Sequence, residues 1–295
     1  MDLLAVTHFL NGFLMIGIPI LLGIYLTSRF RLGWKYWLIG GVVFIISQVF
    51  HIPFNLLVLN PVLLQIQQVM PEVLGLLVVS VLLGLSAGIF ESSARYFMYR
   101  WWIKDARTWR VGVLSGAGHG GIESILLGVL VLLTYFNMVA YRNIDLGSLN
   151  LIPERLSLVS QQLDQYWNLP WYDSLFGALE RMFTIPFHIA ASVLVLQVFT
   201  HSPGKQQFRW LVYAILLHTL MDASAVFISN QWGIYLAELF LGLMAIFDIF
   251  IIFALRQPEP ITAPNEVPYV PTLPPAFTPG PVQETSENLE NTRYQ

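Results

Sequence analysis

Residues 90–124 read FESSARYFMYRWWIKDARTWRVGVLSGAGHGGIES, and they place ionisable side chains inside two apolar runs of the chain. Glu91 and Arg95 lie four residues apart near the end of the first run. His119 and Glu123 lie four residues apart early in the second run. Residues with this spacing share one face of a helix. Because a charged group at lipid depth is costly and usually serves a function, the stretch predicts the centre of a membrane-embedded site.

The composition of the whole chain is that of a multi-pass membrane protein. Of the 295 residues, 56% are hydrophobic and 11% are charged, whereas soluble domains carry about 25% charged residues. No basic tract suggests a nucleic acid as partner. Cysteine is absent, which excludes disulfides, thiolate nucleophiles and cysteine metal ligands. The apolar run at the start is too long for a signal peptide and lacks a basic flank, so we predict a spanning helix there.

Seven apolar runs are long enough to cross a bilayer, which takes about 20 residues each. They cover residues 5–28, 36–59, 73–100, 111–138, 174–200, 208–230 and 233–255. Basic residues follow the first, third, fifth and seventh runs, whereas the other connections carry few. By the positive-inside rule the N-terminus lies outside and the C-terminus lies in the cytoplasm. The expected fold class is all-α, a bundle of about seven transmembrane helices in the cell membrane, expected to be a bacterial plasma membrane.

Two segments differ from these runs. Residues 139–173 form the one long external connection, and PERLSLVSQQLDQYWNLPW within it has the spacing of a helix that lies on the membrane interface. This helix could cap the site or serve only as a linker. Residues 257–295 are rich in proline and acidic side chains, which predicts a disordered cytoplasmic tail. The expected division is therefore a membrane domain, residues 1–256, and a tail, residues 257–295.

Polar residues of four different runs share one predicted depth. Counted inward from the predicted cytoplasmic helix ends, they lie about nine to fourteen residues deep, which is roughly 13–20 Å at 1.5 Å per residue. These residues are Glu91, His119, Glu123, His188, His218 and Asp222. Polar residues with independent structural roles have no reason to share a depth. The layer therefore predicts one functional site.

The residues of the central stretch have two possible roles each. Glu91 is a candidate base with Arg95 as its orienting partner, and the structural alternative is a simple ion pair along the helix. His119 and Glu123 could share a proton, hold a water molecule or ligate a metal. They lie in a row of small residues that lets a neighbouring helix approach closely, namely Gly112, Gly116 and Gly120.

The later runs add two more candidates. His218 and Asp222 lie one turn apart, a spacing that suits an aspartate that fixes the imidazole tautomer. His188 follows Pro186, which frees a backbone carbonyl and can bend the helix toward a cavity. The structural alternative for His188 is a hydrogen bond to the backbone of its own helix. His51 is expected to be structural, because it falls in the outer half of its helix.

With these residues laid out, the chain resembles the YhfC family of predicted intramembrane peptidases, which is related to PrsW and to the CAAX-processing and bacteriocin-processing membrane proteases. The resemblance covers roughly residues 70–230. Glu91 to Arg95 is similar to an E-E-x-x-R motif in which Ser92 replaces the second acid. The following motif corresponds to residues 119–123. Residues 218–222 match H-x-x-x-N/D, and the intervening helix carries a histidine, as in related families.

The resemblance implies a glutamate-dependent peptidase that acts on a membrane-embedded protein or peptide. A carboxylate would activate water, and the histidines with their aspartate would stabilise the oxyanion or protonate the leaving amine. This leading hypothesis assigns no metal and no cofactor. Its catalytic candidates are Glu91, Arg95, His119, Glu123, His188, His218 and Asp222.

Two other functions stay open at this point. The first is a zinc-dependent peptidase, because three histidines and a glutamate could supply a tetrahedral zinc shell, although the H-E-x-x-H signature is absent. The second is a transporter or a non-catalytic scaffold, because chains of histidines and carboxylates inside membranes also relay protons.

Overall fold

The computed structural model describes residues 2–149, 152–201 and 207–257. Within these residues the protein is all-α, as predicted, and contains no strand. The predicted tail lies outside the described residues except for Gln257. The elements in chain order are α1 (Leu3–Phe30), α2 (Lys35–Phe54), the π-helical turn η1 (Asn55–Leu59), α3 (Asn60–Val69), α4 (Glu72–Phe97), the π-helical turn η2 (Met98–Trp102), α5 (Trp109–Arg142), η3 (Leu146–Leu149), α6 (Pro153–Trp167), η4 (Asp173–Leu175), α7 (Phe176–Thr200), α8 (Arg209–Trp232) and α9 (Ile234–Ala254).

Seven helical stretches of the described residues are long and apolar enough to cross a membrane, and each coincides with a predicted run. The second run differs most, because its helix does not end at residue 59. It continues through η1 and α3 to Val69, and the whole stretch has 35 residues. Pro61 comes shortly after the π-helical turn η1. Local π-helical adjustments of this kind let a membrane helix accommodate a proline, so the helix continues past it and α2–α3 is longer than a bilayer requires.

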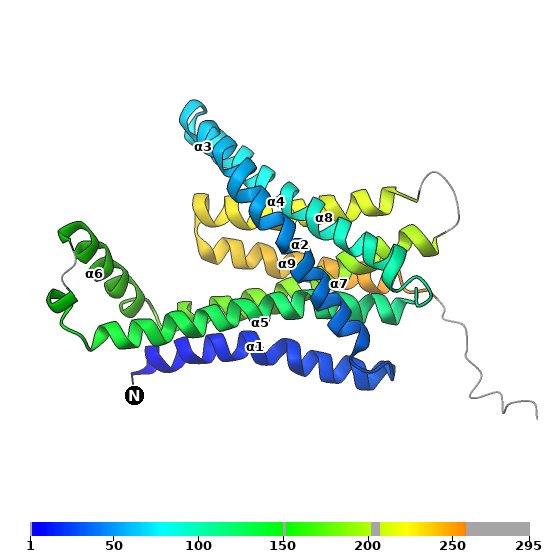
Figure 1. Ribbon diagram of the computed structural model, residues 1–295, viewed down its shortest axis with the longest axis horizontal. Helices are drawn as coiled ribbons and strands as arrows, with labels where there is room; N and C mark the ends of the chain where they lie inside the picture. The colour runs from blue at the N-terminus through cyan, green and yellow to red at the C-terminus, as the bar shows by residue number, and fades with distance from the viewer. Residues whose placement is uncertain (1, 150–151, 202–206, 258–295) are drawn as a thin grey trace, which may run out of the picture. The chain divides into compact units, whose positions relative to one another are not determined.

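The spanning helices of residues 2–257 pack around α5 and α7 (Figure 1). α1 and α2 lie against α5, and α5 lies against α7. α8 and α9 pack against α7, and α4 packs against α8. Gly233, with a φ of 94°, is the only residue between α8 and α9, so these two helices are antiparallel neighbours. α4, α5, α7 and α8 are thereby brought around one central volume.

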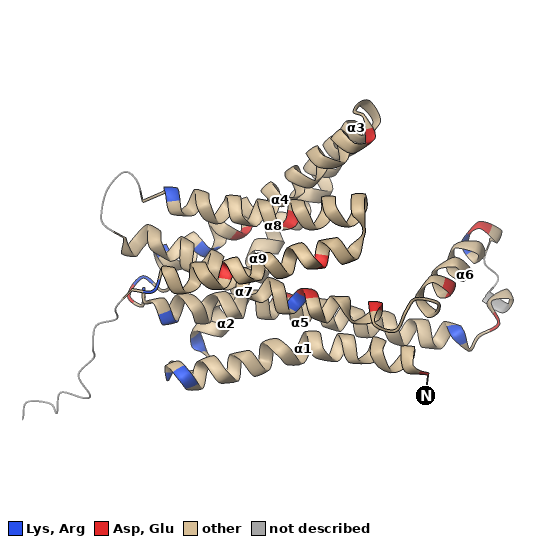
Figure 2. Ribbon diagram, turned by 180° about the vertical axis from the view of Figure 1, so that it is seen from behind, with Lys and Arg blue, Asp and Glu red and all other residues tan. Residues whose placement is uncertain are grey.

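The two ends of the bundle differ in charge (Figure 2). Lys and Arg gather where α1 ends and where α2, α5 and α8 begin, and we call this the basic end. The opposite end, which carries the N-terminus and α6, is called the outer end. Acidic residues lie along the helices between the two ends and also at the outer end, on α6 and beside α3 (Figure 2). That the basic end faces the cytoplasm remains a prediction of the positive-inside rule.

Glycines allow the central helices to approach closely. A Cβ atom added at Gly116 of α5 would lie 2.6 Å from Ile189 Cα of α7. One added at Gly88 of α4 would lie 2.8 Å from the carbonyl oxygen of Ile215 in α8. Real Cβ atoms do not come so close to a backbone, so any larger residue would push these helices apart. The small-residue row predicted in the central stretch thus serves the contact between α5 and α7.

Candidate active site

The seven predicted site residues lie together at the centre of the bundle. α4 carries Glu91 and Arg95, α5 carries His119 and Glu123, α7 carries His188, and α8 carries His218 and Asp222. Glu91, Arg95 and the three histidines are all buried. The residues that were predicted to share one depth therefore lie close together in the structure.

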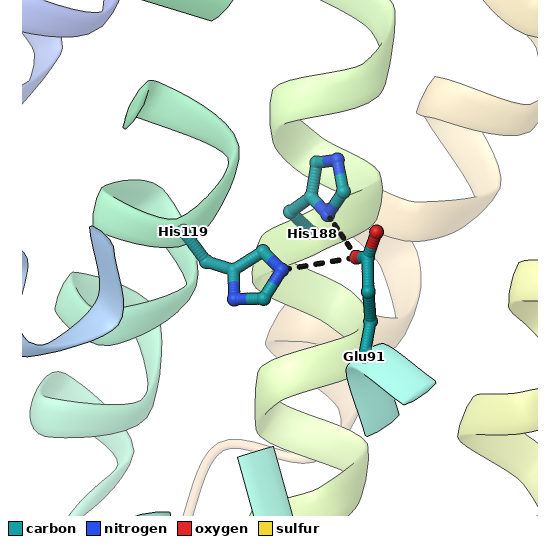
Figure 3. Close-up of side chains that lie close together, drawn as sticks. All are labelled: Glu91, His119 and His188. Atoms are coloured by element: carbon teal, nitrogen blue, oxygen red, sulfur yellow. Dashed lines mark hydrogen bonds and ion pairs between the residues drawn. The ribbon is translucent and has the colours of Figure 1, made fainter. Parts of the chain in front are cut away.

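One carboxylate oxygen is the point on which the histidines converge. His119 Nε2 lies 3.0 Å from Glu91 Oε2. His188 Nδ1 lies 3.9 Å from the same oxygen (Figure 3). His218 Nδ1 also lies 3.9 Å from it. The other oxygen, Glu91 Oε1, accepts a hydrogen bond of 3.1 Å from Gln48 Nε2 of α2. The three contacts to Oε2 define what we call the Glu91 group: Glu91 and the three histidines.

Two further carboxylates lie against the far sides of two of these rings. Glu123 Oε2 is 2.7 Å from His188 Nε2, and Asp222 Oδ2 is 3.3 Å from His218 Nε2. A carboxylate beside one ring nitrogen holds the proton there and leaves a lone pair on the other nitrogen. His188 and His218 thus each direct Nδ1, with its lone pair, toward Glu91.

One predicted pairing differs. His119 and Glu123 share a helix face, but His119 contacts Glu91 and not Glu123. Glu123 contacts His188 and Arg181 instead. The reason is that α5 packs closely on α7, so a long side chain on that face reaches a partner on the neighbouring helix.

Arg95 adds a positive charge to the centre. Its Nη2 donates hydrogen bonds to Glu91 Oε2 at 3.4 Å and to His188 Nδ1 at 2.8 Å. The residue is only 1% exposed, so its side chain is enclosed within the bundle. Its Nε and Nη1 have no hydrogen-bond partner among the described residues. Because buried donors normally find a partner, these nitrogens are available to a bound molecule.

Two polar partners were not predicted. Gln48 is a single amide in an apolar run, a pattern that sequence alone does not separate from ordinary packing. Arg181 of α7 donates to Glu123 Oε1 at 2.7 Å and also contacts Glu180. It lies seven residues, about two turns, before His188, which places both on one face of α7. That spacing is the signal by which Arg181 could have been found.

His51 lies outside the Glu91 group, as expected. Its Nε2 is 3.0 Å from Ser86 Oγ of α4 and 3.0 Å from Asn55 Nδ2. Ser86 in turn donates to Asn55 Oδ1 at 2.9 Å. These three residues join α2 to α4 about one turn beyond Gln48 toward the outer end. Their polar atoms contact one another, which agrees with a structural role.

Two hollows lie beside the site. An apolar groove of about 740 Å³ runs between α2, α4 and η2. Large hydrophobic side chains on its walls are exposed, so the groove faces lipid; among them are Phe50, Ile89 and Phe97. A smaller polar cavity of about 100 Å³ lies between α5, α7 and α8, and Glu91 and His218 are in its wall.

Fold and site together define a multi-pass membrane protein with a buried centre of carboxylates and histidines. The family model described as YhfC intramembrane metalloprotease matches residues 14–245, and the chain belongs to this family. A curated relative, described as uncharacterized membrane protein YhfC of Bacillus subtilis (strain 168), is 34% identical over 145 residues. That match covers 48% of this chain and 54% of the relative, so the chain spans about half the length of the curated protein. No solved structure matches the chain.

Proposed function

We propose that this protein is an intramembrane peptidase that hydrolyses peptide bonds of membrane-embedded substrates at the Glu91 group. The observation that carries the proposal is the convergence of three imidazole nitrogens within 3.9 Å of Glu91 Oε2 in the buried interior of the bundle. Groups of this kind are costly at lipid depth and serve catalysis or transport. The description of the family as an intramembrane metalloprotease supports catalysis over transport.

The donor atoms fit a zinc ion. Glu91, His119 and His188 each offer one ligand atom, and these atoms lie within 4.8 Å of one another. Ligand atoms at about 2.0–2.2 Å from a tetrahedral zinc ion lie about 3.3–3.6 Å from each other. The distances of 3.0 and 3.9 Å from Glu91 Oε2 to the two histidines bracket that range. We therefore assign these three residues as the candidate zinc ligands.

Zinc bound there would polarise the substrate carbonyl and make a water molecule more acidic. His218 is the remaining histidine at the centre, and its Nδ1 has no hydrogen-bond partner among the described residues. Because Asp222 holds the ring proton at Nε2, Nδ1 can take a proton from water and then return it to the leaving amine. We assign His218 as the general base and acid, and Asp222 as its orienting partner.

The position of the Arg95 guanidinium would differ between a zinc-dependent and a metal-free reaction. Its Nη2 lies 2.8 Å from His188 Nδ1, the atom that zinc would need, so the guanidinium and the metal ion compete for that nitrogen. In a metal-free reaction Arg95 keeps this position, and Glu91 is the base that activates water. In both reactions the unpartnered N–H groups of Arg95 could stabilise an oxyanion.

The substrate would approach from the lipid side, along the groove between α2 and α4. Ser47 and Phe90 line this groove and are the chain neighbours of Gln48 and Glu91, which are hydrogen-bonded to each other. An apolar lining suits a transmembrane segment, because such a segment keeps its side chains out of water. The proposed substrate class is therefore a membrane-embedded peptide.

Metal content and cleavage, measured together, test the proposal. Detergent-purified protein should hold about one zinc per chain, as a single mononuclear site does. His119→Ala and His188→Ala should lose it, whereas His201→Ala, an exposed histidine outside the Glu91 group, should retain it. In vesicles, the wild type should cleave members of a membrane-peptide library, and chelation should stop it. Cleavage by zinc-free protein would overturn the metal centre in favour of Glu91 as base, and failure to cleave any member would refute the peptidase.

A further inference from the structure

Hydrolysis at a buried centre needs a route for water, and the polar cavity is placed to supply one. Its volume of about 100 Å³ would hold roughly three water molecules at their liquid volume. Its wall runs from the Glu91 group toward the outer end. The lining residues in this direction are Glu123, Glu180, Arg181, Thr184, Asp222 and Ala225.

Buried polar atoms in the cavity wall lack a protein partner. Thr184 Oγ1 and His218 Nδ1 make no hydrogen bond within the described part of the chain. Buried polar groups without a protein partner are normally satisfied by ordered water. Two such atoms in the wall of one small cavity indicate that the cavity holds water.

Exposure rises from the centre toward the outer end. The side chain of Glu91 is 7% exposed, whereas those of Glu180 and Asp222 are 38% and 39% exposed. Glu180 lies about two turns from His188 toward the start of α7, which is at the outer end. Arg181 bridges Glu180 and Glu123, so charged groups line the wall continuously from the mouth to the centre.

The side of the centre that faces the basic end is closed. On α7, the residues that follow His188 are enclosed, and Ala190, Val193 and Val195 are fully buried. Tyr99 is also fully buried, and its hydroxyl is hydrogen-bonded at 2.8 Å to Ser192 Oγ. This packed layer leaves the outer end as the accessible direction.

From these observations we infer that the water consumed by the reaction enters through the polar cavity from the outer end, while the peptide approaches along the lipid-facing groove. The inference rests on the proposed peptidase function, because only a hydrolase consumes water. In this arrangement water and the peptide reach the Glu91 group from opposite sides. The acidic wall of the cavity would also admit small cations.

Thiol accessibility tests the route directly, because the chain contains no cysteine. Thr184→Cys places a thiol in the cavity wall, and Met182→Cys places one on the same helix at a residue that is 54% exposed on the apolar surface. Ser157→Cys on α6 marks the side of the outer end. The probe is the silver ion, a small thiol-reactive cation, added to one side of sealed vesicles. The readout is the fraction of thiols protected from later alkylation in denaturant.

Thr184→Cys should react from the same side as Ser157→Cys, and at least about tenfold faster than Met182→Cys, because a thiol ionises in water but not in lipid. Equal rates for the two α7 variants, or reaction of Thr184→Cys only from the opposite side, would overturn the route. The measurement does not depend on activity. Fast labelling without any cleavage would refute the peptidase function but not the water-filled cavity. Cleavage without labelling would refute only the proposed route for water.

Discussion

Replacing Glu123 by Gln tests whether a carboxylate fixes the proton of His188. Glu123 Oε2 lies 2.7 Å from His188 Nε2, and Oε1 accepts a 2.7 Å hydrogen bond from Arg181. Glutamine keeps the shape, but if its amide oxygen stays with Arg181, its amide nitrogen must face the N–H of His188. The ring would then move its proton to Nδ1, toward which Arg95 already directs an N–H. The lone pair that the metal needs would be lost.

Loss of such a partner beside a metal-ligating histidine typically costs 10- to 100-fold in metal affinity, about 1.4–2.7 kcal/mol. We expect Glu123→Gln to weaken zinc binding by this factor, measured by competition with a chromophoric chelator, and to lower kcat/KM alongside. The matched control is Glu238→Gln, the same substitution at a buried residue of α9 outside the Glu91 group. If folded Glu123→Gln protein bound zinc within about threefold of the wild type, the tautomer argument would be refuted.

Three further substitutions test the packing, the groove and the limits of the site. Gly116→Ala should lower the free energy of unfolding by about 1–3 kcal/mol, because the new Cβ would lie 2.6 Å from Ile189 Cα. Gly17→Ala, where a Cβ meets nothing within 4 Å, should leave the melting temperature at or above that of the wild type. Ala94→Trp should fill the apolar groove and abolish cleavage without changing zinc content, and wild-type cleavage by this variant would exclude the groove as the peptide route. His51→Gln should change the cleavage rate by less than about threefold, since an amide can replace the ring in its hydrogen bonds, and a loss of most activity would extend the site along α2.

The sequence by itself determined the number of candidate spanning helices and the residue types of the candidate site. A helix that crosses a membrane must satisfy its backbone internally and be apolar over about 20 residues, so each span can be recognised without knowledge of its neighbours. The same local geometry placed His218 and Asp222 on one helix face, where they are in contact. Local signals failed at the end of the second span, because the helix continues past Pro61 through a π-helical turn that the sequence does not reveal.

Only the tertiary structure decided which atoms meet. The position of a residue along a helix does not tell how that helix is rotated or which helix it packs against. Spacing along the chain therefore paired His119 with Glu123, whereas in the structure His119 contacts Glu91. Gln48 became a partner of Glu91 only because α2 and α4 pack together. The convergence of three ring nitrogens on one oxygen depends on close approaches of α4 to α8 and of α5 to α7. A glycine permits such an approach, but the backbone that fills the space, such as Ile189 beside α5, is supplied by a distant part of the chain.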